Sequence, residues 1–348
     1  MLTHLTLSSP LYSQPPPVAT FSIVAYDSVA EEWGVAVQSK FLAVGAVVPW
    51  ARAGIGAIAT QAWGNTTYGP EGLALLEMGV PAKEAIEVLI SKDKNRDQRQ
   101  LGVVDAKGQA AAWTGDKCFN WAGHIAGEGF CVQGNILVGE EVIRKMAEAF
   151  QTIEGTLSRR LIAALHAGQG AGGDSRGRQS AALLVVCEGG GYSGYNDRFI
   201  DLRVDDHPHP IRELERIYDL HEQVFQGGAY VRLGILALKQ DKKEKANKAL
   251  DRAISIANKY PENAHLLNSI AWELAINEFR LDDALKLARE AVKLAPQEGN
   301  IWDTLGEVYA RLGRYSEAVK AEKQAVSLTD GNKEFQEKLE SWQKRVKK

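Results

Sequence analysis

The chain has 348 residues, of which 45% are hydrophobic and 24% are charged, and its formal net charge is -3 at pH 7. These values are typical of a soluble globular protein with room for two domains, and a slight acidic excess without a long basic run disfavours nucleic acid as a partner. No uninterrupted run of about eighteen apolar residues occurs, so we expect no membrane helix.

Residues 1–19 end in the run PPPVA. They lack the basic start and the continuous apolar centre of a secretory signal, so we predict a disordered leader or the remnant of a signal whose start lies elsewhere. The compartment therefore stays open between the cytoplasm and export.

Residues 20–204 alternate between patterns of period two and helical patterns, which predict the following elements in chain order. They are strands at Thr20–Tyr26, Gly34–Ser39 and Gly54–Gln61, helices at Gly72–Met78 and Ala82–Ser91, strands at Leu101–Asp105 and Gln109–Thr114, helices at Glu140–Phe150 and Leu157–Ala167, and strands at Ser180–Cys187 and Phe199–Val204. Strand pairs that alternate with helix pairs bury two sheets face to face with helices outside. We therefore predict an α+β domain, a four-layer αββα sandwich.

The segment Asp205–Pro210 contains two prolines, which disfavour regular structure, and it is followed by a helical pattern over Ile211–Phe225. We predict that residues 205–228 form a linker and a connecting helix. The two linker histidines and the three cysteines, which form no CxxC pair, give no reason to expect a metal or a cofactor.

Residues 229–348 contain an internal repeat of about 34 residues. One copy has Trp302, Leu305, Gly306, Tyr309, Ala318 and Ala325; another has Ile270, Ala271, Leu274, Ala284, Ala291 and Pro296; the first has Tyr230, Leu233, Gly234, Ala237, Ala246, Leu250, Ala253 and Pro261. This spacing resembles the tetratricopeptide repeat, an all-α module. Residues Lys333–Lys348, with a sparse apolar stripe, are expected to form a cap helix.

Small residues at facing positions of the two helices in each repeat let the backbones approach closely. Such helix pairs curve into a groove, so we expect a protein or peptide partner there. Packing of the repeats against the first domain and self-association into a homo-oligomer remain alternatives.

Several motifs in residues 20–204 and the residue before them occur in a fixed order: ATFSIVAYD, GVAVQSKFLAVGAVVPWARAGIGAIATQAWGN, YGPEGL, RQLGVVD, WTGDKC, GHIAGEGFCVQGN and GGDSRGRQSAALLV. Together they resemble the family known as domain of unknown function 1028, which is classed with the N-terminal-nucleophile (Ntn) hydrolases. The resemblance implies the same αββα fold and, as activity, hydrolysis of a small amide or peptide-like bond.

The resemblance implies that Thr20 is the nucleophile. A threonine hydroxyl needs a nearby base, and the α-amine of an N-terminal threonine, with a pKa near 8, supplies one. Nineteen residues precede Thr20 here, and a nitrogen inside a peptide bond cannot act as a base. Either the Ala19–Thr20 bond is cut, or the mature chain starts at Thr20, or this copy is inactive and Thr20 is an ordinary strand residue.

Polar residues at predicted strand ends are further candidates. Ser39 and Lys40 end the second strand, and Lys40 or Arg52 would lower the pKa of the Thr20 amine by like-charge repulsion. Solvated strand ends would account equally well for them.

Amide and hydroxyl side chains also follow the third strand and surround Gly134. Thr60, Gln61 and Asn65 are candidate donors to an oxyanion, and Gln133 and Asn135 are candidates to bind the substrate.

The glycine-rich turn before the strand at Ser180 contains Asp174 and Arg176. These two either clamp an amine or carboxylate of a small substrate or form a structural turn pair. Two functions thus remain: an amidohydrolase with a docking module, or a non-catalytic scaffold that uses an inactive Ntn-like fold and the repeats.

Overall fold

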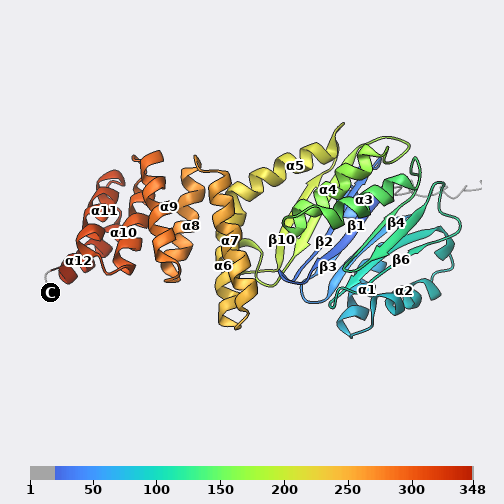
Figure 1. Ribbon diagram of the computed structural model, residues 1–348, viewed down its shortest axis with the longest axis horizontal. Helices are drawn as coiled ribbons and strands as arrows, with labels where there is room; N and C mark the ends of the chain where they lie inside the picture. The colour runs from blue at the N-terminus through green and yellow to red at the C-terminus, as the bar shows by residue number, and fades with distance from the viewer. Residues whose placement is uncertain (1–19, 347–348) are drawn as a thin grey trace, which may run out of the picture.

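The computed structural model describes residues 20–346, so the predicted leader at residues 1–19 lies outside the described part. A mixed domain of strands and helices stands at one end of an elongated molecule, and a row of paired helices extends from it (Figure 1).

Two antiparallel sheets form the first domain. The larger sheet has the order β10-β9-β2-β1-β8-β7, with β1 at Thr20–Asp27, β2 at Glu32–Ser39, β7 at Gly123–Gly127, β8 at Phe130–Gly134, β9 at Ser180–Val186 and β10 at Arg198–Val204. The smaller sheet has the order β3-β4-β5-β6, with β3 at Pro49–Arg52, β4 at Gly56–Ala62, β5 at Arg99–Asp105 and β6 at Ala110–Thr114. The strand β1 therefore lies in the interior of the larger sheet, paired on both sides.

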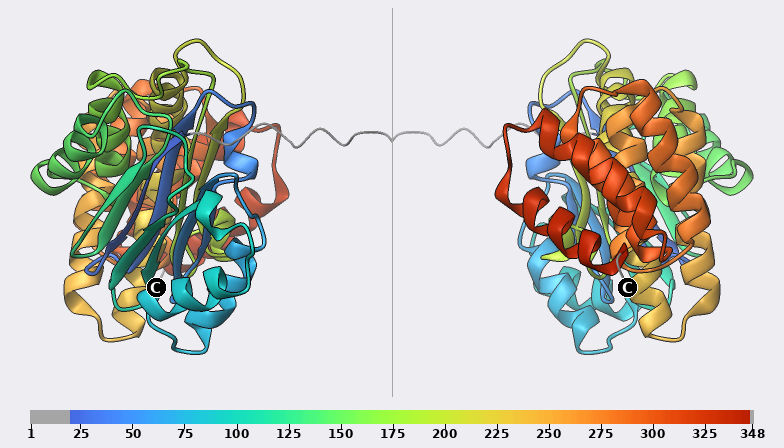
Figure 2. Two further views of the ribbon diagram at one scale, coloured as in Figure 1. Left: turned by 90° about the vertical axis from the view of Figure 1, so that its right-hand side faces the viewer. Right: turned by 90° about the vertical axis from the view of Figure 1, so that its left-hand side faces the viewer.

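Four helices cover the outer faces of the two sheets. Helices α3 (Glu141–Thr152) and α4 (Leu157–Gly170) pack on the larger sheet, and α1 (Tyr68–Glu77) and α2 (Ala82–Ser91) pack on the smaller one. A separate apolar cluster, which includes Val24, Val37, Ala59 and Val104, fills the space between the sheets. The predicted αββα arrangement is confirmed, and Figure 2 shows the two helix pairs on opposite sides of the sheets.

Three strands were not predicted: β3, β7 and β8. β3 has four residues and begins with Pro49, which is typical of an edge strand. β7 and β8 begin or end with glycine, and glycine lowers strand propensity. Because β8 pairs with β1, this hairpin places Gln133 directly beside Ser22.

The second domain consists of antiparallel helix pairs. After α5 (Pro210–His221) and one π-helical turn (Glu222–Gln226), the pairs are α6 (Gly227–Lys239) with α7 (Lys243–Lys259), α8 (Ala264–Ile276) with α9 (Leu281–Leu294), and α10 (Gly299–Arg311) with α11 (Tyr315–Leu328), followed by α12 (Lys333–Val346). Phe335 and Trp342 are the buried residues of α12, as expected of a cap helix. Among residues 20–346 no helix has the length and apolar character needed to cross a membrane.

The two domains share one continuous apolar core. Residues of α4, β10, α5 and α6 belong to the same cluster, and the rings of Phe199 and Tyr230 meet edge to face at 5.2 Å.

Basic residues in and just before α7 bind acidic residues at the turn between β1 and β2. Lys242 and Lys245 contact Glu31 at 2.8 Å, and Arg252 contacts Glu32 at 3.3 Å. The second domain is thus held to the first by ion pairs as well as by the apolar core.

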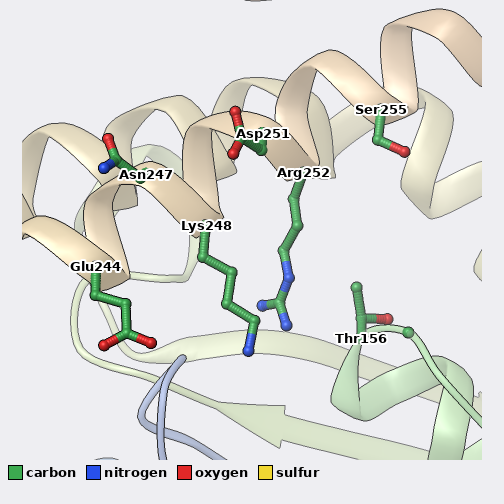
Figure 3. Close-up of a pocket in the computed structure, with 8 residues that line it drawn as sticks. Thr156, Glu244, Asn247, Lys248, Asp251, Arg252 and Ser255 are labelled. Atoms are coloured by element: carbon green, nitrogen blue, oxygen red, sulfur yellow. The ribbon is translucent and has the colours of Figure 1, made fainter.

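A groove of about 970 Å³ runs along this junction between α7 and the start of α4. Lys248 and Arg252 project from α7 toward the first domain, and Thr156 faces them (Figure 3). Both helices of the first repeat pair therefore contact the first domain, α6 through the apolar core and α7 through the ion pairs.

Candidate active site

Thr20 is the first residue of β1, and its side chain is fully buried. It lies opposite Ser39 of β2, and its hydroxyl donates a hydrogen bond to the backbone carbonyl of Gln38. The backbone N–H of Asn135 donates to the Thr20 carbonyl at 3.0 Å. Because side chains alternate along a strand, Thr20 shares with Ser22 and Val24 the face that looks toward the smaller sheet.

Five fully buried residues, here called the buried polar network, join the two sheets next to Thr20: Ser22, Gln61, Gln100, Gln133 and Asn135. The Ser22 hydroxyl donates to Gln61 Oε1 at 2.6 Å and accepts from Gln133 Nε2 at 2.6 Å. The Gln100 Oε1 atom accepts from Gln61 Nε2 at 2.7 Å and from Asn135 Nδ2 at 2.9 Å.

The network is anchored to the backbone through Gln100. Its Nε2 donates to the carbonyl of Gly134 at 2.8 Å and to that of Gly123 at 3.1 Å. The neighbouring Gly102 leaves room for the network, because a Cβ at this position would overlap Gln133 Oε1. The arrangement thus requires glycine at position 102 and hydroxyl or carboxamide side chains at the network positions.

Each amide nitrogen of the network donates a hydrogen bond to another member or to the backbone. Two amide oxygens of the network accept none from residues 20–346. Gln133 Oε1 and Asn135 Oδ1 are buried and have no hydrogen-bond partner among the described residues. Buried acceptors are normally satisfied. Gln133 Oε1 lies against Gly102, whereas Asn135 follows β8 and binds the Thr20 carbonyl through its backbone N–H, so Asn135 Oδ1 is the free acceptor nearer to Thr20.

Asp174 and Arg176 lie beside the same end of β2. The Asp174 carboxylate is buried and accepts from the backbone N–H of Lys40 at 3.0 Å, from Arg176 Nη2 at 2.8 Å and from the Arg176 backbone N–H at 2.9 Å. The turn therefore fixes the backbone that follows Ser39, while the Lys40 side chain is exposed.

The structure does not bring Thr60 and Asn65 to Thr20. Thr60 lies on the face of β4 that also carries Ile58, which packs against α1 and α2, and its hydroxyl donates to the Asn65 carbonyl at 3.1 Å. Asn65 Nδ2 donates to Asp93 at 3.4 Å.

Arg52 is also remote from Thr20. It pairs with Glu77 at 2.6 Å and lies opposite Gly56, at the other end of β4 from Gln61. It is therefore not placed to lower the pKa of a Thr20 amine.

Ser22 and Gln100 are site residues that were not predicted from the sequence. Both are polar residues inside otherwise apolar strands, and both occupy the same alternation phase as residues of the core between the sheets, Val24 and Val104. A polar residue at a strand position whose neighbours in alternation are buried was the signal in the sequence. The residues that bind Ser22 and Gln100 come from strands that are distant in sequence, so the signal did not identify them.

The network contains hydroxyl and carboxamide groups only. Such groups bind and orient but do not titrate near neutral pH. The network itself therefore contains no group that would accept a proton near neutral pH.

No curated protein matches the chain. The crystal structure of protein SPO2555 from Silicibacter pomeroyi, described as DUF1028, is 35% identical, covers 58% of this chain and 89% of that chain, and gives a TM-score of 0.54. The Sgt2 TPR domain from Aspergillus fumigatus is 20% identical, covers 35% of this chain and 79% of that chain, and gives a TM-score of 0.28.

Family models match both parts of the chain. A tetratricopeptide-repeat model matches residues 227–260 and 299–332, so the C-terminal region contains these repeats. The model described as a family of unknown function (DUF1028) matches residues 20–214, which is more than half of the chain. This chain therefore belongs to the DUF1028 family.

Proposed function

We propose that the first domain is an N-terminal-nucleophile amidohydrolase for a small amide or peptide-like bond, and that the repeats recruit a protein or peptide partner. The observation that carries the proposal is the position of Thr20. It opens a central strand and faces the layer between the two sheets, beside the buried polar network.

The proposed reaction starts from a chain in which the Ala19–Thr20 bond has been cut. The freed α-amine takes the proton of the Thr20 hydroxyl, and the oxygen attacks the carbonyl carbon of the substrate. The tetrahedral intermediate expels the amine, which takes up a proton, and leaves an acyl ester on Thr20. Water then hydrolyses this ester and restores the hydroxyl.

Neighbouring residues have positioning roles in this scheme. Ser39 lies opposite Thr20, and the contact of Asp174 with the Lys40 backbone holds that strand end in place. The unpartnered Oδ1 of Asn135, whose backbone N–H binds the Thr20 carbonyl, is proposed to accept from the substrate amine or from the freed α-ammonium, and Gln133 is proposed to hold Ser22 in place.

A second function, a non-catalytic scaffold, is favoured by one specific observation. The Thr20 side chain is fully buried, and its hydroxyl already donates to the Gln38 carbonyl. An uncut chain would therefore hold the hydroxyl away from any substrate, and the repeats alone would carry the function.

Intact mass combined with labelling separates the two functions. We expect purified protein to have lost residues 1–19 and to gain an adduct at Thr20 from a β-lactone probe. Thr20→Ala should lower amide hydrolysis by several orders of magnitude, while Thr20→Ser, which keeps a hydroxyl, should retain measurable activity. An active preparation that still carries residues 1–19, or an active Thr20→Ala variant, would contradict the hydrolase.

A further inference from the structure

A second pocket, here called the junction pocket, lies where the two domains meet, at the opposite end of the larger sheet from Thr20. Its volume is about 340 Å³, within the range of small-molecule sites. Arg198 pairs with Val186 at one end of β9, whereas Ser39, the partner of Thr20, pairs with Ser180 at the other end. The length of β9 separates these ends, a distance of roughly 20 Å.

Three parts of the chain line the junction pocket. The loop before β10 contributes Tyr192, the end of α5 and the π-helical turn contribute His221 and Phe225, and the repeats contribute Arg232 and Ser269. The helices α5 and α6 and the strand β10 come together here (Figure 1). A ligand in the pocket would therefore touch both domains.

Apolar side chains form one side of the pocket. Phe199 is held by its edge-to-face contact with Tyr230. Val224 and Phe225, from the π-helical turn, expose 61% and 50% of their surface, and Tyr192 exposes 74%. Single π-helical turns are frequent at functional sites. The apolar surface is thus available to the body of a ligand.

His221 offers a hydrogen-bond donor to the pocket. The Tyr218 hydroxyl donates to Gln226 Oε1 at 3.3 Å, so the Gln226 amide N–H points at His221 Nδ1, at 3.1 Å. Burial lowers the pKa of His221 to about 4, so the ring is neutral at pH 7. Its proton therefore resides on Nε2, which has no protein partner within residues 20–346.

Two further donors surround Gly228. A Cβ at Gly228 would meet Ser269 Oγ at 3.0 Å and Arg232 Nη1 at 3.5 Å, so the glycine keeps the space between them open. Arg232 Nη1 binds Glu273 at 2.7 Å, but Arg232 Nε is buried without a partner in the described chain.

The carboxylates near the pocket are already engaged. Asp201 binds Arg198 at 3.0 Å and Arg203 at 2.9 Å, and Glu273 binds Arg232. Among the charged residues that line the pocket, the two arginines, Arg198 and Arg232, outnumber the one carboxylate, Asp201, and the unused groups are donors. A ligand that supplies acceptors and negative charge fits this arrangement.

We propose that the junction pocket binds a small carboxylate with an apolar body. The carboxylate accepts from Arg232, Ser269 and His221, and the body packs on Phe225 and Tyr192. The proposal does not depend on a catalytic role for Thr20. It makes the pocket a ligand site that links the repeats to the first domain.

Calorimetric titration of the full chain with three probes tests the ligand class. We expect 3-phenylpropionate to bind saturably and 3-phenylpropionamide to bind with an affinity that is lower by about tenfold or by a larger factor. Acetate, which has no apolar body, should show no binding. Equal affinity for the acid and the amide, or the absence of saturable binding by the acid, overturns the proposal.

Three variants test the location. Gly228→Ala should fill the space between Ser269 and Arg232 and weaken binding of 3-phenylpropionate roughly tenfold, while an alanine within α6 should not lower thermal stability. Tyr192→Ala should also weaken binding. Tyr195→Ala, on the same loop, 86% exposed and outside the pocket, is the matched control and should bind as the original chain does. Unchanged affinity in Gly228→Ala and Tyr192→Ala, or an equal loss in Tyr195→Ala, overturns the assignment.

Discussion

Gln100 is the residue on which the buried polar network depends. Its side chain accepts from two amides and donates to two backbone carbonyls, so it joins β4, β5 and β8. Removal of one partner from a buried hydrogen bond leaves the other unsatisfied, which costs more than the bond itself contributes.

Gln100→Leu is therefore expected to lower the free energy of unfolding by about 3 kcal/mol, because the amides of Gln61 and Asn135 lose their acceptor. Urea denaturation followed by circular dichroism measures the change. Gln109→Leu, at an exposed position just before β6, is the control and should change the unfolding free energy by less than about 0.5 kcal/mol. Equal effects of the two substitutions would show that the network adds no stability.

Among the individual elements, the cap helix α12 is held over α10 and α11 by a cluster of charged groups. Lys338 Nζ contacts Asp303 at 2.7 Å and lies 5.0 Å from the centre of the Trp272 ring. Glu322 of α11 is fully buried beside them. Burial, and next the charge of Asp303, raise the pKa of Glu322 to about 8 from its ordinary value of 4.5.

This shift predicts how stability depends on pH. Between pH 4.5 and about 8 the folded chain holds a proton on Glu322 that the unfolded chain releases. The contribution of Glu322 to the free energy of unfolding is therefore fully present below pH 4.5, and it is lost as the pH rises through about 8. Glu322→Gln should remove this loss, so that its melting temperature falls less between about pH 6 and about pH 9 than that of the original chain. Parallel pH profiles for the two proteins would contradict the shift.

Across the two domains, the shared core joins the repeats to the sheets. Tyr230 of α6 is fully buried and packs on Phe199 of β10, yet its hydroxyl has no hydrogen-bond partner in the described structure. Because one apolar cluster spans both domains, we expect the chain to unfold in a single calorimetric transition.

Tyr230→Ala should remove this contact, lower the unfolding free energy by about 3 to 5 kcal/mol and split the transition into two. Tyr230→Phe removes only the unpartnered hydroxyl and should leave one transition with unchanged or slightly higher stability. Two transitions in the original chain would show that the two domains unfold independently. One transition in Tyr230→Ala would show that the coupling of the domains does not depend on this contact.

Elements with local signals could be predicted from the sequence. Period-two alternation predicted β1 and β2, and the spacing of Trp302, Gly306 and Tyr309 predicted a repeat whose helices pack at short range. The short strand β3 and the glycine-flanked strands β7 and β8 lack such signals, because they owe their strand conformation to the neighbours with which they pair.

Only the tertiary structure showed which of the polar residues contact one another. Gln133 and Asn135 were candidates from the sequence, but Ser22 joins them because β8 pairs with β1, and Gln100 joins them because β5 lies in the facing sheet. The junction pocket likewise exists because β10 packs beside α6. Such contacts depend on strand order and domain docking, which a local pattern does not encode.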